Sequence, residues 1–142
     1  MSSIGNVLAI HLTRLREWLV GGGGMKHLVF VYGTLRQGQS NHHYLKGCDL
    51  LGRFDTPEEY ALFDLDAYPA MIFGKKSVAG EVYMINDEVL ASLDRLEDVP
   101  VEYRREQIET IFGLAWVYLY QLDLTANKEI LSGNWCQRNN DS

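Results

Sequence analysis

Short apolar segments separated by turn residues dominate this chain, and they constrain its fold more than any other feature. Their lengths and their β-branched and aromatic residues are typical of β-strands. Clusters such as Asp55-Thr56-Pro57 and Gly74-Lys75-Lys76 mark the turns between them. Many short strands with one clear helix late in the chain predict an α+β fold with a curled sheet or small barrel. The predicted strands are residues 27–32, 49–54, 60–65, 71–73, 78–85, 102–109 and 114–121, and the predicted helices are 40–46 and 87–97.

The later helix carries the most informative residue. Asn86 is a suitable N-cap, and Pro100 ends the helix soon after Glu97. At about 100° per residue, Glu97 lies about 50° from the centre of the apolar stripe and so points toward the interior. The stripe consists of Val89, Leu90, Leu93 and Leu96, whereas the charges expected to face solvent are Glu88, Asp94, Arg95 and Asp98.

A carboxylate directed into an apolar interior loses hydration, and this loss raises its pKa. A raised pKa suits a general base that works near neutral pH. The alternative is that Glu97 lies at a frayed helix end and turns to solvent, or pairs with Arg104 or Arg105. The helical wheel alone favours neither interpretation.

The turn after the first strand, Tyr32-Gly33-Thr34-Leu35, supplies a second set of polar groups. A buried strand that ends in Gly-Thr exposes consecutive backbone N–H groups, and glycine allows conformations that aim them at one point. Such a nest can hold a carboxylate or a developing oxyanion, and the Thr34 hydroxyl adds a donor. The chain has no GxxxxGK[ST] motif, so this turn is not a nucleotide P-loop. A plain structural turn is the alternative.

Five segments resemble, in order, the signature segments of the gamma-glutamylcyclotransferase-like proteins. The resemblance extends from about Met25 to Trp135, and the length is similar to that of the small bacterial members and the γ-glutamylamine cyclotransferases. The third segment corresponds to the part of the family that holds its catalytic glutamate. The segments are 30–35 (FVYGTL) with Gly38 and Asn41, 80–83 (GEVY), 93–97 (LDRLE) with 103–105 (YRR), 115–118 (AWVY) and 132–135 (SGNW).

The resemblance implies a small mixed β-barrel with flanking short helices, and a reaction within one substrate molecule. The α-amine of a γ-glutamyl group attacks its own γ-carbonyl, which forms 5-oxoproline and releases an amine or amino acid. By the same resemblance, Glu97 is the catalytic residue that moves the proton, and no metal or cofactor is needed. The substrate-binding residues that it implies are Tyr32, Gly33, Thr34, Leu35, Tyr103 and Tyr118.

Composition narrows the class of protein further. A net charge of -6 with 13 scattered basic residues argues against nucleic acid as the main partner. The small-molecule γ-glutamyl substrate is what the resemblance implies. Cys48 and Cys136 belong to no metal-binding or disulfide spacing, which indicates a reducing compartment such as the cytoplasm. No apolar run approaches the roughly 20 residues of a membrane span.

Residues 1–24 differ in character from the rest of the chain. Apolar residues recur there at helical spacing, and four glycines follow at 21–24. We expect this segment to be an extension upstream of a native start at Met25, and one domain to occupy residues 25–142. An amphipathic helix that binds a partner or a membrane surface is the alternative.

Two other functions are compatible with the sequence. A regulatory module could use the same loop to bind a small carboxylate metabolite without turnover, although the retained Glu97 favours an enzyme. An interaction protein acting through residues 1–24 would lose its function when they are deleted.

Other polar residues have simpler interpretations. His42-His43 is expected to be a surface pair, and Cys48 a buried thiol. A solvated strand edge is expected for Glu102, Arg104, Arg105 and Glu106, although an arginine there could also attract an acidic substrate.

Overall fold

The computed structural model describes residues 24–140, and every predicted strand is present in it. The expectations for residues 1–23 therefore lie outside the described residues. Two short elements were not predicted, namely β8 and the 3-10 helix η2. The strands are β1 (Lys26–Val31), β2 (Asp49–Asp55), β3 (Tyr60–Asp64), β4 (Pro69–Phe73), β5 (Ala79–Asn86), β6 (Tyr103–Thr110), β7 (Gly113–Tyr120) and β8 (Lys128–Glu129); the helical elements are η1 (His42–Leu45), α2 (Asp87–Leu96) and η2 (Trp135–Asn140).

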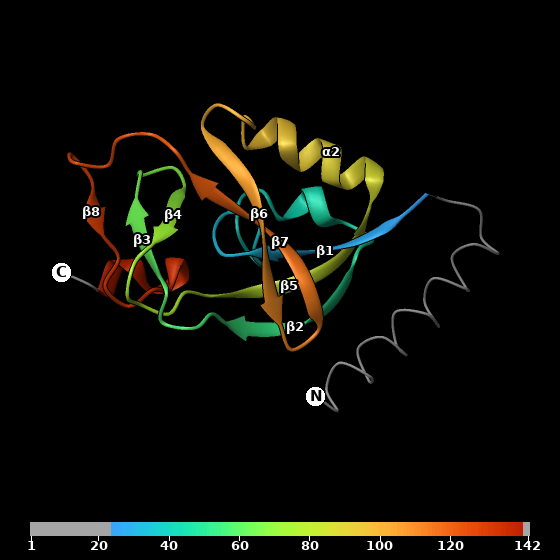
Figure 1. Cartoon of the computed structure of the whole chain (residues 1–142), viewed down its shortest axis with the longest axis horizontal. Helices are drawn as coiled ribbons and strands as arrows, with labels where there is room; N and C mark the ends of the chain where they lie inside the picture. Colours follow the sequence, from blue (N-terminus) through green and yellow to red (C-terminus); the bar gives the residue numbers. More distant parts are fainter. Residues whose placement is uncertain (1–23, 141–142) are drawn as a thin grey trace.

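The larger sheet has five strands in the order β2-β5-β1-β7-β6 (Figure 1). β1 pairs antiparallel with β5 and parallel with β7, so the sheet is mixed. β6 and β7 form the predicted hairpin, in which Thr110 pairs with Gly113 across a two-residue turn. The central position of β1 places its carboxyl end, and the Tyr32–Leu35 loop that follows, in the middle of the molecule.

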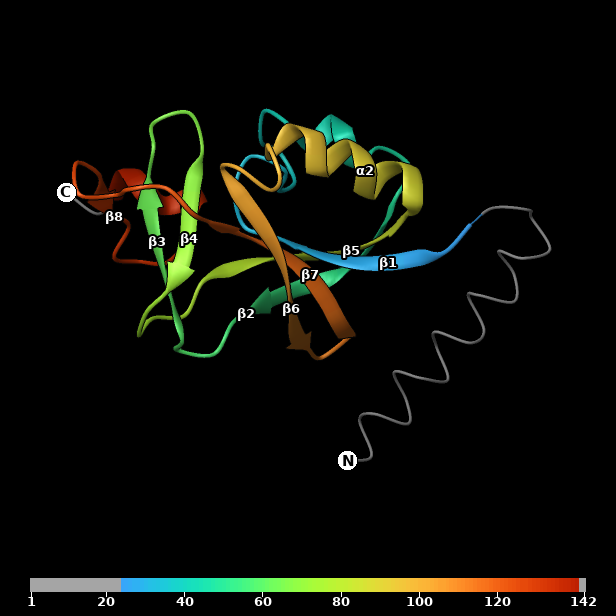
Figure 2. The same cartoon turned by 45° about the horizontal axis from the view of Figure 1, so that its top comes forward.

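The smaller sheet has the order β4-β3-β8 and lies beside one end of the larger sheet (Figures 1 and 2). The C-terminal segment joins the two sheets. The Ile130 N–H donates to the Leu62 carbonyl of β3, and the Ala79 N–H at the start of β5 donates to the Gly133 carbonyl.

The expected barrel is not confirmed. Among residues 24–140, no strand pairing joins the outer strands β2 and β6 of the larger sheet, so its ladder stays open. Over the described residues, the observed class is a mixed α+β fold with two sheets and one α-helix.

Both faces of the larger sheet are buried, which explains the continuous apolar run of β1. Leu28 and Phe30 pack on the face toward the smaller sheet, in a core cluster that includes Leu62. Val29 and Val31 pack on the opposite face, in a second cluster that includes Leu93 of α2. α2 and η1 lie on this second face (Figure 2).

The caps of the two predicted helices differ. The Oδ1 atom of Asn86 accepts a hydrogen bond from the Val89 N–H at 2.9 Å, as expected for an N-cap. Asn41 precedes η1 but makes no side-chain cap; its amide instead donates to the Thr34 hydroxyl. In the described part of the chain, no helix has the length and apolar character needed to cross a membrane.

Candidate active site

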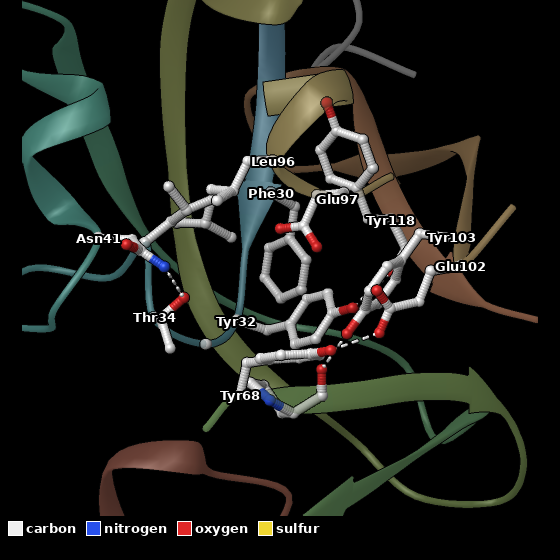
Figure 3. Close-up of a pocket in the computed structure, with 14 residues that line it drawn as sticks. Phe30, Tyr32, Thr34, Asn41, Tyr68, Leu96, Glu97, Glu102, Tyr103 and Tyr118 are labelled. Atoms are coloured by element: carbon white, nitrogen blue, oxygen red, sulfur yellow. Dashed lines mark hydrogen bonds between the residues drawn. The ribbon is translucent and has the colours of Figure 1, made fainter. Parts of the chain in front are cut away.

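A cavity of about 270 Å³ lies at the carboxyl end of β1, between the end of α2 and the start of β4 (Figure 3). Side chains from both sheets and from α2 line it, and its volume lies near the lower end of the range for small-molecule sites. All of the residues that the sequence predicted for the site line this cavity: Glu97, Tyr32, Gly33, Thr34, Leu35, Tyr103 and Tyr118.

Glu97 enters the cavity from the C-cap position of α2. Its N–H donates to the Leu93 carbonyl at 2.9 Å, so helical geometry extends through Glu97. Because residues four apart share a helix face, Glu97 points to the side on which Leu93 is fully buried. Its carboxylate projects into the cavity in Figure 3 and forms no hydrogen bond or ion pair with another described residue.

The two arginines considered as partners of Glu97 pair with other residues. Arg104 Nε lies 3.0 Å from Glu106 Oε1, and Arg105 Nε lies 2.9 Å from Asp94 Oδ1. Burial, and then the negative charge of Glu102, raise the pKa of Glu97 to about 7. Glu97 therefore changes its charge in the pH range where a general acid/base must work.

The loop opposite Glu97 presents unused donors. The backbone N–H groups of Gly33, Thr34 and Leu35 donate to no other described residue. Two backbone bonds fix the loop: the Arg36 N–H donates to the Gly33 carbonyl at 3.0 Å, and the Asn41 N–H donates to the Thr34 carbonyl at 2.8 Å. The Thr34 hydroxyl accepts from the Asn41 amide at 2.9 Å, which leaves its own proton available to a ligand.

Gly33 is required for a reason that the sequence did not reveal. Glycine was predicted to serve here through its backbone freedom, but the φ angle of Gly33 is not positive. A Cβ atom at this position would overlap Cγ of Pro69 and lie 2.5 Å from its Cδ. Glycine therefore allows β4 of the smaller sheet to pack directly against the loop.

The three tyrosines predicted to bind substrate form walls. Tyr32 donates its hydroxyl to the Tyr118 carbonyl at 2.5 Å, and Tyr103 donates to the Pro69 carbonyl at 2.8 Å. The Tyr118 hydroxyl points away from the cavity and donates to Asp94 at 2.8 Å (Figure 3). Their rings shape the cavity while their hydroxyl protons are already donated within the protein.

Glu102 was expected at a solvated strand edge, and this expectation is wrong. It precedes β6 and lines the cavity, where its Oε2 accepts from the Tyr68 hydroxyl at 2.5 Å. This hydrogen bond, together with burial, raises the pKa of Tyr68 to about 12. The turn over residues 98–101 decides where Glu102 points, and no local sequence pattern indicates that direction.

Asp94 and Arg105 were also expected to face solvent, but both are half-buried and hold the end of α2 in place. Asp94 Oδ1 accepts from the Tyr118 hydroxyl and pairs with Arg105. The Arg105 guanidinium lies over the Trp116 ring, 4.4 Å from its centroid. The last turn of α2, which leads to Glu97, is thereby fixed to β6 and β7.

A buried ion pair fixes the other side of the loop. Arg36 Nε lies 2.9 Å from Glu81 Oε2, and both side chains are less than a tenth exposed. Glu81 also accepts from the Gln37 N–H, and Arg36 donates to Asn134 Oδ1 at 2.8 Å. Glu81 is a lone charge in an otherwise apolar strand, which is the sequence signal that indicates a buried partner.

His42 is not part of a surface pair, because its Nδ1–H donates to the Leu35 carbonyl at 2.9 Å; only His43 is exposed. Cys48 is half-buried, and burial raises its pKa. The expected independence from metals and cofactors stays a prediction.

The fold and cavity define a small-molecule site in which a desolvated carboxylate faces a loop of free backbone donors. The family model described as "Gamma-glutamyl cyclotransferase, AIG2-like" matches residues 29–137, and the chain belongs to this family.

Three proteins illustrate the similarity. A Vibrio cholerae protein, provisionally named a gamma-glutamylcyclotransferase, is 60% identical over 114 residues, which cover 80% of this chain and 99% of its own. The solution structure of protein ytfP from Escherichia coli has a TM-score of 0.67 and 42% identity, with 79% and 98% of the two chains covered. The gamma-L-glutamyl-butirosin B gamma-glutamyl cyclotransferase of Niallia circulans is 34% identical over 105 residues, 67% of each chain.

Proposed function

We propose that this protein converts the γ-glutamyl group of a small amide to 5-oxoproline and releases the amine. The single observation that carries the proposal is the Glu97 carboxylate, which has no hydrogen-bond or ion-pair partner among the described residues. It lies in a cavity also lined by Gly33, Thr34 and Leu35, whose N–H groups donate to no described residue. The family supports a cyclotransferase, and the name of the Niallia circulans relative supports a γ-glutamyl substrate.

The proposed reaction needs positioning and proton transfer. The free N–H groups of the loop bind the substrate carboxylate or stabilise the oxyanion that develops on the γ-carbonyl. Glu97 takes a proton from the α-ammonium, and the freed amine nitrogen attacks the γ-carbonyl carbon. The bond from that carbon to the leaving nitrogen then breaks as Glu97 gives its proton to this nitrogen. The attacking nitrogen loses its second proton, which the released amine takes up to leave as an ammonium ion.

The size of the cavity and the chemistry of the reaction are consistent. A cavity of about 270 Å³ suits a small-molecule substrate such as a γ-glutamyl amide. Because nucleophile and electrophile belong to one molecule, holding the γ-glutamyl group in a folded conformation supplies much of the rate enhancement.

The free thiols of Cys48 and Cys136 support a reducing, cytoplasmic location.

The substitution Glu97→Gln tests the proposal. The full chain is incubated with a panel of γ-glutamyl amides and γ-glutamyl amino acids, and 5-oxoproline is quantified by mass spectrometry. We expect Glu97→Gln to reduce turnover by about 10²- to 10⁴-fold, the usual effect of a positioned proton-transfer group. Ligand binding, measured by calorimetry, should persist because the loop is intact.

Glu88→Gln is the matched control, because Glu88 lies exposed in the first turn of the same helix. It should retain the wild-type rate. Wild-type turnover by Glu97→Gln would refute the role of Glu97, and binding without product in the wild type would favour the metabolite-binding alternative.

A further inference from the structure

The charged side chains that line the cavity are all acidic. Of the described residues that line it, only Glu97 and Glu102 have ionisable acidic or basic groups other than tyrosine hydroxyls, and none is Lys, Arg or His. The nearby arginines are paired elsewhere, Arg36 with Glu81, Arg104 with Glu106 and Arg105 with Asp94. A carboxylate on the leaving group would therefore meet two like charges and no cation.

The two ends of the cavity differ in chemistry. Figure 3 shows Thr34 and Asn41 on one side, the Glu97 carboxylate in the middle, and Glu102 on the other side, where the Tyr68 hydroxyl reaches it. With the glutamyl head at the loop donors and the scissile amide beside Glu97, the released amine extends toward Glu102. Glu102 thus lies where the leaving group is recognised.

Glu102 is positioned for recognition and keeps free acceptor capacity. Its N–H donates to the Asp98 carbonyl and its own carbonyl accepts from the Gln121 N–H, both at 2.9 Å, so its backbone is fixed. Tyr68 donates to Oε2, while Oε1 has no partner among the described residues. A carboxylate offers about four lone-pair directions, so an ammonium group can still bind to it.

We infer that Glu102 is a specificity-determining residue that selects γ-glutamyl amides whose released amine carries a second, positively charged group. This inference rests on the proposed cyclisation and adds the class of leaving group. An ammonium beside Glu102 forms a charge-assisted hydrogen bond and offsets the repulsion between Glu102 and ionised Glu97.

The test compares three amides of equal chain length that differ only in the terminal group: γ-glutamyl-1,4-diaminobutane, γ-glutamyl-butylamine and γ-glutamyl-4-aminobutyrate. The kcat/KM for 5-oxoproline release is measured with the wild type, Glu102→Gln and Glu106→Gln. Glu106 pairs with Arg104 outside the cavity, so its variant is the matched control for loss of one negative charge.

We expect the wild type to prefer the diaminobutane amide to the butylamine amide by about tenfold or more, the range of one charge-assisted hydrogen bond. Glu102→Gln should reduce this preference to about twofold, mainly by raising KM for the cationic substrate. The kcat/KM for the butylamine amide should change less than that for the diaminobutane amide, because the neutral amine has no cation for Glu102 to bind. Glu106→Gln should keep the wild-type preference.

The outcomes separate this inference from the proposed function. If the wild type cyclises the neutral amide as well as the cationic one, or if Glu102→Gln keeps the preference, the role of Glu102 is refuted while the cyclisation stands. If no amide yields 5-oxoproline, both are refuted. The wild-type comparison needs no variant, so it decides the question even when Glu102→Gln fails to fold.

Discussion

At the scale of single residues, Glu97 should set the pH dependence of the reaction. Only the ionised carboxylate can accept the ammonium proton, and burial with the nearby charge of Glu102 raises its pKa to about 7. We therefore expect kcat/KM to rise with pH and to level off above about 7. A pH–rate profile from about pH 3.5 to 9 measures this rise; a rise centred near the ordinary glutamate pKa of about 4.3 would contradict the buried environment.

The same shift predicts that Glu97 destabilises the fold at neutral pH. A carboxyl whose pKa is raised in the folded state favours folding when protonated, and this stability is lost as pH rises from the ordinary glutamate pKa of 4.5 to about 7. Glu97→Gln does not titrate, so it should gain stability relative to the wild type over that window, by up to about 3 kcal/mol at pH 8.

Urea unfolding of the two proteins at pH 5 and pH 8 measures this difference. The advantage of Glu97→Gln should be small at pH 5 and larger at pH 8, whereas exposed Glu88→Gln should show no such trend. A Glu97→Gln protein that is less stable than the wild type at pH 8 would show that the ionised carboxylate is well solvated in the fold.

The inward direction of Glu97 was one of the two directions that the helical wheel allowed, and it follows from local geometry because helical hydrogen bonding extends through Glu97. Glu97 follows Leu93 by four residues, and Leu93 is fully buried. The direction of Glu102 could not be predicted in this way. The chain reverses between the two glutamates through Asp98, whose φ of 51° is uncommon for a residue other than glycine.

At the scale of elements, the attachment of α2 to the sheet should control the rate. Asp94 pairs with Arg105 of β6 and accepts from Tyr118 of β7. Asp94→Asn removes the charge that holds Arg105, so the last turn of α2 and Glu97 should move. We expect kcat to fall about tenfold, since small misplacements of a catalytic group are costly, with a smaller change in KM.

Asp87→Asn is the control for this prediction. It removes the same charge from the other end of α2, where Asp87 contacts His27 near the surface. Steady-state kinetics with one γ-glutamyl amide measures both variants. An unchanged kcat for Asp94→Asn would show that the helix end is held by packing alone.

The individual strands and helices could be predicted from the sequence, but their arrangement in space could not. Short apolar runs between turn residues predicted the strands, and the Asn86 cap predicted the start of α2, within a few residues, because these signals are local. The open edges of the larger sheet and the partners of Asp94 depend on contacts between segments far apart in the chain. A helical wheel shows only the residues of one helix. It therefore placed Asp94 in solvent, because the contacts of Asp94 with β6 and β7 do not appear on it.

At the scale of the whole molecule, the cavity exists because the two sheets meet at one point. Gly33 follows β1 of the larger sheet, and Pro69 begins β4 of the smaller sheet. The absence of a Cβ at Gly33 lets the proline ring lie against the loop that lines the cavity. The stability of the molecule and the geometry of its binding loop are therefore coupled through this contact.

Gly33→Ala should separate the sheets at this point. The added methyl group overlaps the Pro69 ring, and overpacking of this kind typically costs about 1–3 kcal/mol. The loop shifts with it, so KM for a γ-glutamyl amide should rise as well. Urea unfolding and steady-state kinetics on the same preparation measure both effects.

Pro69→Ala provides the decisive comparison, because it removes Cγ and Cδ, the two ring atoms in conflict, while the remaining Cβ lies at an acceptable 3.9 Å. If the clash is the cause, Pro69→Ala should restore most of the stability and KM lost in Gly33→Ala, so the double variant is more stable than the sum of the single changes implies. Additive losses would instead show that Gly33 is needed for its backbone conformation. The contact between the sheets would then not set the shape of the loop, and the two sheets could be varied independently without altering the cavity.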